Sequence, residues 1–333
     1  MSTQSRIRAL FALMAMLVLA FAFAACGDDD ESSTSAEEST SEETTEAGST
    51  LIEENPDNSG VKLTVGSKNF TEQIILGEIY SQALTAAGYD VSTDLNLGSE
   101  VIALKALENG SISGYPEYTS TALQSFFKAA PEDVPSDAQE AADQATAEFE
   151  KSGLTAFAPT PFADANAVGL LQETADELGV TSISDLKGQS EDLTLAGSPE
   201  CEQRTDCLAG LEEFYGLKFG DFTPIDIGLR YEVLDKGDAD LSILFTSDAQ
   251  LFVEDDYTIL EDDQGIIPSG NVIWVTDEAT VEEAGPDYQA TIEKVQEGLS
   301  LEVIQELNAR VDIDKEDAAE VATQYLEETG YIE

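Results

Sequence analysis

The sequence predicts an α/β protein built from two lobes with a cleft between them. The region of residues 61–333 is long enough to form two hydrophobic cores. A strand, a polar loop and a helix follow one another at its start, and a faint internal repeat recurs at an offset of 127 residues. Together these features favour two similar α/β units over one large sheet.

The first unit opens with residues 61–65, whose apolar side chains alternate as in a half-buried strand. The alternation stops at Gly66. Asn69 and Glu72 then stand three apart, which is the spacing of a capping box, ahead of an apolar helical run at 74–79. The free N–H groups of such a helix favour a negative group. A purely structural strand-to-helix turn is the alternative.

The repeat aligns residues 106–114 with residues 233–241. In each copy a helical pattern ends at a glycine, Gly110 or Gly237, which suits the left-handed position after a helix. A short strand follows in both copies. Chance similarity is the alternative, because few positions match.

The same offset places Tyr118 on Phe245 and Thr121 on Asp248. Each lobe therefore has an aromatic residue at the C-terminal end of a strand. Ligands bind at that edge in open α/β sheets. The alternative is that both rings belong to the hydrophobic core.

Two proline-containing segments, 160–167 and 266–272, each lead into an apolar strand and are predicted to cross between the lobes. Lobe 1 is then formed by residues 61–163 and 271–333, and lobe 2 by residues 164–270. Helical patterns near 289–309 and 316–328 complete the chain.

The N-terminal segment has the pattern of an export signal. Arg6 and Arg8 precede an apolar run that ends in small residues at Cys26, so residues 1–25 are predicted to be a signal peptide. The segment Phe23-Ala-Ala-Cys26 resembles a bacterial lipobox, which implies lipidation of Cys26. An uncleaved N-terminal anchor is the alternative, and both place the protein on the extracytoplasmic face of the membrane.

Residues 26–60 are predicted to be a disordered acidic tether, because they are rich in Ser, Thr, Asp and Glu and lack basic residues. Further on, Cys201 and Cys207 are expected to form a disulfide in an oxidising compartment, worth about 2 kcal/mol for so short a loop. A metal site is the weaker reading of the two thiols, since the chain has no histidine.

Composition excludes several classes of function. The formal net charge of −53 makes nucleic acid and anionic membrane surfaces poor partners, and it suggests a high-salt habitat. The chain has no histidine, P-loop, dinucleotide fingerprint or nucleophile elbow, so catalysis is not expected. No cofactor or metal is predicted.

Several motifs occur in order along the chain: Gly66-Ser-Lys-Asn-Phe-Thr-Glu-Gln73, Tyr115-Pro-Glu-Tyr-Thr-Ser-Thr121, Ser198-Pro-Glu-Cys-Glu-Gln-Arg-Thr-Asp-Cys207, Asp226-Ile-Gly-Leu-Arg-Tyr231, Phe245-Thr-Ser-Asp248 and Glu306-Leu-Asn-Ala-Arg-Val311. In these motifs the chain resembles the glycine betaine/choline-binding proteins of osmoprotectant ABC importers. The resemblance implies a type II periplasmic binding protein fold with two hinge crossings and the ligand in the inter-lobe cleft. It further implies a monomer that delivers its ligand to an ABC permease.

In that family a box of aromatic rings, usually tyrosines, holds a trimethylammonium group by cation–π attraction. The resemblance implies that Tyr118 is one wall and Thr121 a polar neighbour. It places Lys68, Asn69 and Gln73 in the motif near the anionic end of the ligand. Arg204 is a further candidate for the ligand carboxylate.

The sequence departs from the family at three walls of the box. Asn166 and Phe245 stand where the family has tyrosines, and the third position falls near Ser269 to Asn271. Asn166 and Asn271 could instead bind a different polar or zwitterionic ligand. A sensory or adhesive lipoprotein that keeps the two hinged lobes but has lost its transporter is a second alternative.

Overall fold

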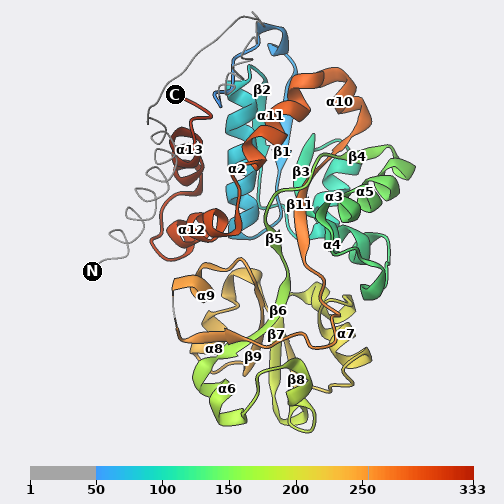
Figure 1. Ribbon diagram of the computed structural model, residues 1–333, viewed down its shortest axis with the longest axis vertical. Coiled ribbons are helices and arrows are strands. Elements are labelled where there is room, and N and C mark those ends of the chain that lie inside the picture. The colour runs from blue at the N-terminus through green and yellow to red at the C-terminus, as the bar shows by residue number, and fades with distance from the viewer. Residues whose placement is uncertain (1–49, 254) are drawn as a thin grey trace, which may run out of the picture. The chain divides into compact units, whose positions relative to one another are not determined.

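The computed structural model describes residues 50–253 and 255–333, which form two lobes, each built around its own β-sheet (Figure 1). The predictions for the signal peptide at 1–25, for lipidation of Cys26 and for the tether at 26–49 lie outside the described residues. Among the described helices, none is both long and apolar enough to cross a membrane.

The first lobe contains a sheet with the strand order β2-β1-β3-β11-β4, and the short strand β5 also pairs with β11. Its β1 pairs in parallel with β2 and β3, whereas β11 runs antiparallel to β3. The bounds of these strands are β1 Lys62–Gly66, β2 Asp90–Asp94, β3 Gly114–Tyr118, β4 Leu154–Ala156, β5 Ala163–Asp164 and β11 Gly270–Asp277.

Helices surround this first sheet. One of them, α2, packs against three helices from the end of the chain, α11, α12 and α13. The N-terminal half of the lobe is therefore held together by the C-terminal residues. The helices are α2 Thr71–Ala86, α3 Glu100–Glu108, α4 Thr119–Thr121, α5 Ala138–Phe149, α10 Glu278–Ala284, α11 Pro286–Gln296, α12 Leu301–Asp312 and α13 Ala318–Glu328.

The second lobe has a sheet with the order β10-β6-β9-β7-β8, in which β7 is parallel to β8 and β9 while β6 is antiparallel to β9. Its strands are β6 Asn166–Leu171, β7 Thr194–Gly197, β8 Asp221–Pro224, β9 Leu241–Phe245 and β10 Tyr257–Ile259. Its helices are α6 Gln172–Leu178, α7 Leu208–Glu213, α8 Glu232–Asp235 and α9 Ala249–Val253. A separate core of aliphatic side chains fills this lobe.

The lobes are joined by two crossings that lie side by side, one through β5 into β6 and one through β11 (Figure 1). Asp164 pairs with Gly270 across them. These are the two segments that the sequence predicted as crossings. The predicted repeat also corresponds to the structure, because Gly110 and Gly237 both have positive φ and each precedes the strand that ends at Tyr118 or Phe245.

Two sequence predictions about elements are wrong. The predicted helix at 289–309 is two helices, α11 and α12, because Ser300 caps a new helix with a hydrogen bond from Val303 N to its Oγ of 3.3 Å. The tether was predicted to extend to residue 60, but residues 50–60 belong to the first lobe. Ile52 N donates to Tyr331 O at 2.8 Å, and the buried Asn58 donates to Ala87 O at 2.8 Å.

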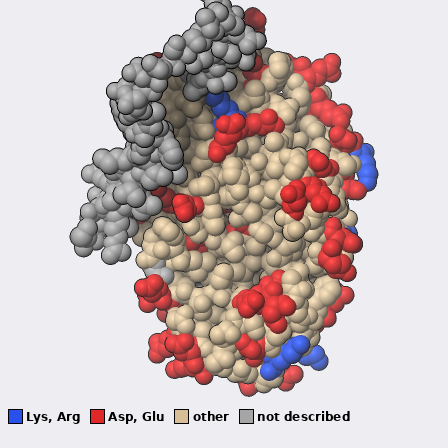
Figure 2. Space-filling view, in the orientation of Figure 1, with Lys and Arg blue, Asp and Glu red and all other residues tan. Residues whose placement is uncertain are grey.

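Acidic side chains are spread over the face shown in Figure 2, where basic side chains occur in few places. Seven ion pairs form within the described part of the chain. Most of the acidic residues in that part of the chain therefore have no basic partner in an ion pair.

Candidate functional site

A cleft between the lobes is lined by residues of both. Seven of the nine predicted ligand residues line it. They are Lys68, Asn69, Tyr118 and Thr121 from the first lobe and Asn166, Arg204 and Phe245 from the second. The two lobes therefore bring together residues that are far apart in the sequence, such as Lys68 and Phe245.

Three aromatic rings form a cluster in this cleft: Phe70, Tyr118 and Phe245. The ring centroids of Phe70 and Tyr118 lie 6.2 Å apart with nearly parallel planes, and those of Phe70 and Phe245 lie 5.1 Å apart. Phe70 precedes α2, Tyr118 ends β3 and Phe245 ends β9, so three elements each contribute one ring. Phe70 was missed by sequence reasoning although it lies within the first motif.

A positively charged side chain already lies over each of these rings, and Lys68 Nζ is 5.8 Å from the centroid of Phe70. Lys68 Nζ is 4.4 Å from the centroid of Tyr118 and forms an ion pair of 2.5 Å with Glu117 Oε1. Arg230 Cζ is 5.0 Å from the centroid of Phe245, and its Nε donates to Asp248 Oδ2 at 3.0 Å. The cluster thus has the geometry that stabilises a cation against aromatic faces.

Glu72 holds Tyr118 in place instead of capping its own helix, which corrects the predicted capping box. The N-cap of α2 is Phe70, without a side-chain hydrogen bond. Tyr118 Oη donates to Glu72 Oε1 at 2.5 Å, and Asn308 Nδ2 donates to Glu72 Oε2 at 3.1 Å. Burial raises the pKa of Glu72, and hydrogen bonds from Ser247, Tyr118 and Asn308 offset part of that rise.

Asn308 belongs to the motif at residues 306–311 and connects it to two of the other motifs through hydrogen bonds with Glu72 and Ser247. Its Nδ2 also donates to Ser247 O at 3.2 Å, so this α12 residue of the first lobe contacts the second lobe. Tyr231 and Arg230, from another of the motifs, both hydrogen-bond Asp248. The motifs therefore meet directly behind Tyr118, Arg230 and Phe245, which line the cleft.

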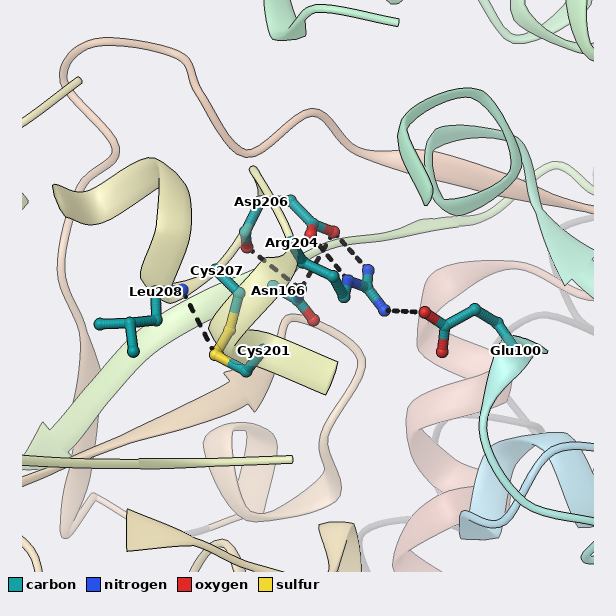
Figure 3. Close-up of a disulfide and its surroundings, with 7 residues drawn as sticks. All are labelled: Glu100, Asn166, Cys201, Arg204, Asp206, Cys207 and Leu208. Carbon is teal, nitrogen blue, oxygen red and sulfur yellow. Dashed lines mark hydrogen bonds and ion pairs between the residues drawn. A yellow bond between two sulfur atoms is a disulfide. The ribbon is translucent and has the colours of Figure 1, made fainter. Parts of the chain in front are cut away.

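Arg204 lies on the small loop closed by the disulfide between Cys201 and Cys207, which the structure contains (Figure 3). Its Nε donates to Asp206 Oδ1 at 2.8 Å. Its NH1 lies 3.5 Å from Glu100 Oε1 at the start of α3 in the other lobe. The guanidinium therefore already has two carboxylate neighbours.

Asn166 supports the same group from the first residue of β6 (Figure 3). Its Nδ2 lies 3.1 Å from Asp206 Oδ2 and 3.2 Å from Asp206 O. The amide that stands in the place of a family tyrosine thus positions the carboxylate partner of Arg204.

Two predicted ligand residues, Gln73 and Asn271, do not line the cleft. Gln73 is fully buried, and its Oε1 accepts a hydrogen bond from Lys68 N at 3.3 Å. Asn271 Nδ2 donates to Thr160 O and Phe162 O, both at 2.9 Å. Gln73 therefore shapes the first loop and Asn271 ties the two crossings together, and their contact with a ligand stays a prediction.

Asp164 is a site residue that the sequence analysis missed. It is 7 % exposed, lines the cleft and belongs to a crossing. Its Oδ1 accepts from Thr246 Oγ1 at 2.8 Å and from Ser247 N at 2.9 Å. Burial and the neighbouring Glu72 raise the pKa of Asp164 to about 8.

Comparison with known proteins places this cleft in a family context. Residues 61–328 match the family described as the substrate binding domain of ABC-type glycine betaine transport system. This is a family of binding proteins and not of enzymes.

Two curated relatives are similar over most of their length. A glycine-betaine-binding protein of Pseudomonas aeruginosa is 32 % identical over 80 % of this chain and 87 % of its own. The glycine betaine-binding protein YehZ of Escherichia coli is 25 % identical over 83 % of this chain and 93 % of its own. Among solved structures, a glycine betaine/carnitine/choline ABC transporter protein matches with a TM-score of 0.63 and 26 % identity, over 81 % of this chain and all of the other.

Proposed function

Because the chain belongs to the family of substrate-binding domains of ABC-type glycine betaine transport systems, we propose that it captures a small quaternary-ammonium osmoprotectant of the glycine betaine or choline type. The observation that carries the proposal is the cluster of Phe70, Tyr118 and Phe245, each of whose rings already lies next to a cationic side chain. A quaternary ammonium cannot donate hydrogen bonds, so aromatic faces are its natural partners, each worth about 0.5–2 kcal/mol.

Binding is coupled to closure of the lobes in this proposal. Phe70 and Tyr118 belong to the first lobe and Phe245 to the second, so a ligand between the rings contacts both lobes at once. A ligand shifts an open–closed equilibrium only by binding the closed form better, and only the closed form offers all three rings.

The closed protein would deliver the ligand to an ABC permease. The proposal includes export by the signal peptide at 1–25, lipidation of Cys26 and anchoring on the extracytoplasmic face of the membrane. It also includes action as a monomer. The family description and the solved structure, both of which name an ABC transport system, and the export-like N-terminal sequence support this part of the proposal.

Calorimetric titration of the purified protein with glycine betaine, choline and proline tests the proposal. We expect saturable binding of at least one quaternary ammonium, and loss of about 2 kcal/mol or more of binding free energy on Tyr118→Ala, since ring and hydrogen bond are both removed. Tyr118→Phe keeps the ring and is the matched control. Binding of proline alone would favour a different small polar ligand instead. In that case Lys68 and Arg230 would keep their places over the rings.

A further inference from the structure

The basic residues that line the described cleft are all neutralised by the protein itself. Lys68 pairs with Glu117, Arg230 pairs with Asp248, and Arg204 lies between Asp206 and Glu100. Glu117 and Asp248 are buried behind the lining, with 0 % and 3 % exposure. A ligand carboxylate would therefore compete with a protein carboxylate at each of these cations.

The carboxylates of the cleft are not neutralised to the same extent. Among the lining residues, Asp164 and Glu200 take part in none of the ion pairs of the described chain. Asp164 is the buried one of the two, and its hydrogen bonds come from a hydroxyl and a backbone N–H, which are neutral groups. Together with the partners of the basic residues, the cleft contains more carboxyl groups than basic groups.

Asp164 is also close to the aromatic cluster. It interacts electrostatically with the Tyr118 hydroxyl, and it hydrogen-bonds the two residues that directly follow Phe245. It lies on the crossing strand β5, which joins the lobes. Among the residues that line the described cleft, Asp164 is therefore the buried carboxyl group that a positive ligand group would meet without a basic partner.

We propose that the cleft selects a quaternary ammonium of net positive charge, of the choline class, over a zwitterion such as glycine betaine, and that Asp164 is the residue that determines this preference. This inference rests on the proposed function and specifies the charge of its ligand. Choline and glycine betaine share the trimethylammonium group, so the aromatic cluster alone does not distinguish them. The surplus carboxylate does, since the carboxylate of betaine would find each basic group already paired.

The charged surroundings of Asp164 give the preference a pH signature. They are Glu72 on α2, Asp248 after β9 with its partner Arg230, and the Tyr118 hydroxyl. In the cleft without ligand, burial and Glu72 raise the pKa of Asp164 to about 8, so the group is mostly protonated at neutral pH. An adjacent cation favours the carboxylate. Choline binding should therefore release a proton and strengthen as the pH rises.

Calorimetry of both ligands from about pH 6 to about pH 9, in two buffers of different ionisation enthalpy, tests the proposal. Neither ligand changes charge in that range. We expect choline to bind about tenfold or more tightly than glycine betaine at the high end, and to release a fraction of a proton near neutral pH. Asp164→Asn should weaken choline binding about tenfold and abolish the proton release, while betaine affinity changes less than about threefold. The exposed Asp238→Asn removes the same charge and should alter neither.

Each other outcome contradicts the proposal in a different way. Tighter binding of betaine, or equal losses for both ligands in Asp164→Asn, would overturn the charge preference while leaving the quaternary-ammonium function in place. Loss of choline binding in Asp164→Asn without any proton release in the parent protein would overturn the role of Asp164 as the ionising counter-charge. Silence from both ligands would overturn the proposed function and the preference with it.

Discussion

Asp164 and Glu72 are two buried carboxyl groups beside the cleft, and burial raises the pKa of both. Glu72 adds to the rise for Asp164, and Asp248 adds to the rise for both groups. The folded state is therefore more stable when both groups are protonated. The unfolded chain releases the Asp164 proton near the ordinary pKa of 3.8, whereas the folded protein keeps it to about pH 8. Between these values the folded state binds more protons, so the unfolding free energy falls as the pH rises.

We expect the melting temperature of the protein to fall between about pH 5 and about pH 8.5, and the fall to be smaller in Asp164→Asn, because the amide stays neutral. A difference of about 1–2 kcal/mol corresponds to a few degrees in a chain of this size. Differential scanning calorimetry at the two pH values measures it, with the exposed Asp238→Asn as the control for net charge. Parallel pH profiles for the parent and Asp164→Asn would contradict this account.

At the scale of single residues, the sequence predicted the positions of the cleft residues better than their partners. Tyr118 and Phe245 were found because they end two strands of a repeat. The partners of Lys68 and Arg230 lie 49 and 18 positions away, and the chain has 68 acidic residues. No sequence pattern indicates which carboxylate faces which base, so Asp164 was recognised only from the fold.

Among the structural elements, the loop between Cys201 and Cys207 holds Arg204 opposite Glu100 of the other lobe. The two cysteines are six positions apart, so the disulfide closes a short loop and removes little conformational entropy from the unfolded chain. We expect the double substitution of Cys201 and Cys207 by serine to lower the unfolding free energy by about 2 kcal/mol, measured by urea denaturation.

Reducing agent serves as the control for this change, because it should shift the parent protein toward the double variant and leave the variant unaffected. A parent protein whose urea midpoint does not respond to complete reduction would show that the disulfide contributes no stability.

Gly270 begins β11, at the point where the second crossing passes the first lobe. A Cβ atom there would lie 2.8 Å from the backbone N of Ser120, closer than real contacts allow, and would also meet its side chain. We expect Gly270→Ala to displace the crossing and to weaken ligand binding about tenfold or more. Gly228→Ala, whose Cβ would make an ordinary contact, is the control and should fold and bind normally.

The elements that the sequence predicted correctly carry a strong local pattern. The alternation of residues 61–65 predicts a strand, and β1 spans Lys62–Gly66. The glycines of the repeat follow the ends of two helices. The wrong predictions concern segments whose structure depends on contacts with distant parts of the chain. Residues 50–60 look like a tether in composition, but Ile52 pairs with Tyr331 at the far end of the chain. The helical period continues through residues 297–300, although the chain turns there.

For the whole molecule, the dominant quantity is the net charge of −53. On the face shown in Figure 2, acidic side chains outnumber basic ones. Folding therefore brings negative charges close together, and their repulsion destabilises the folded state. We expect the melting temperature to rise between about 0.1 M and about 2 M KCl, since the Debye length falls from about 10 Å to below about 3 Å. A neutral osmolyte at equal osmolality is the control, because it is excluded from the protein surface but does not screen charges. A melting temperature that stays constant in KCl would contradict adaptation to high salt.

A crystal structure of the protein with choline tests the central claim most directly. The account predicts that the trimethylammonium group lies against Phe70, Tyr118 and Phe245, within about 6 Å of their ring centroids. It predicts Asp164 as the nearest of the cleft-lining carboxylates that have no basic partner. Lys68 would then leave the face of Tyr118 or share it. A choline molecule found outside this cluster, or a cleft that keeps Lys68 over Tyr118 and admits no choline at saturating concentration, would contradict the account.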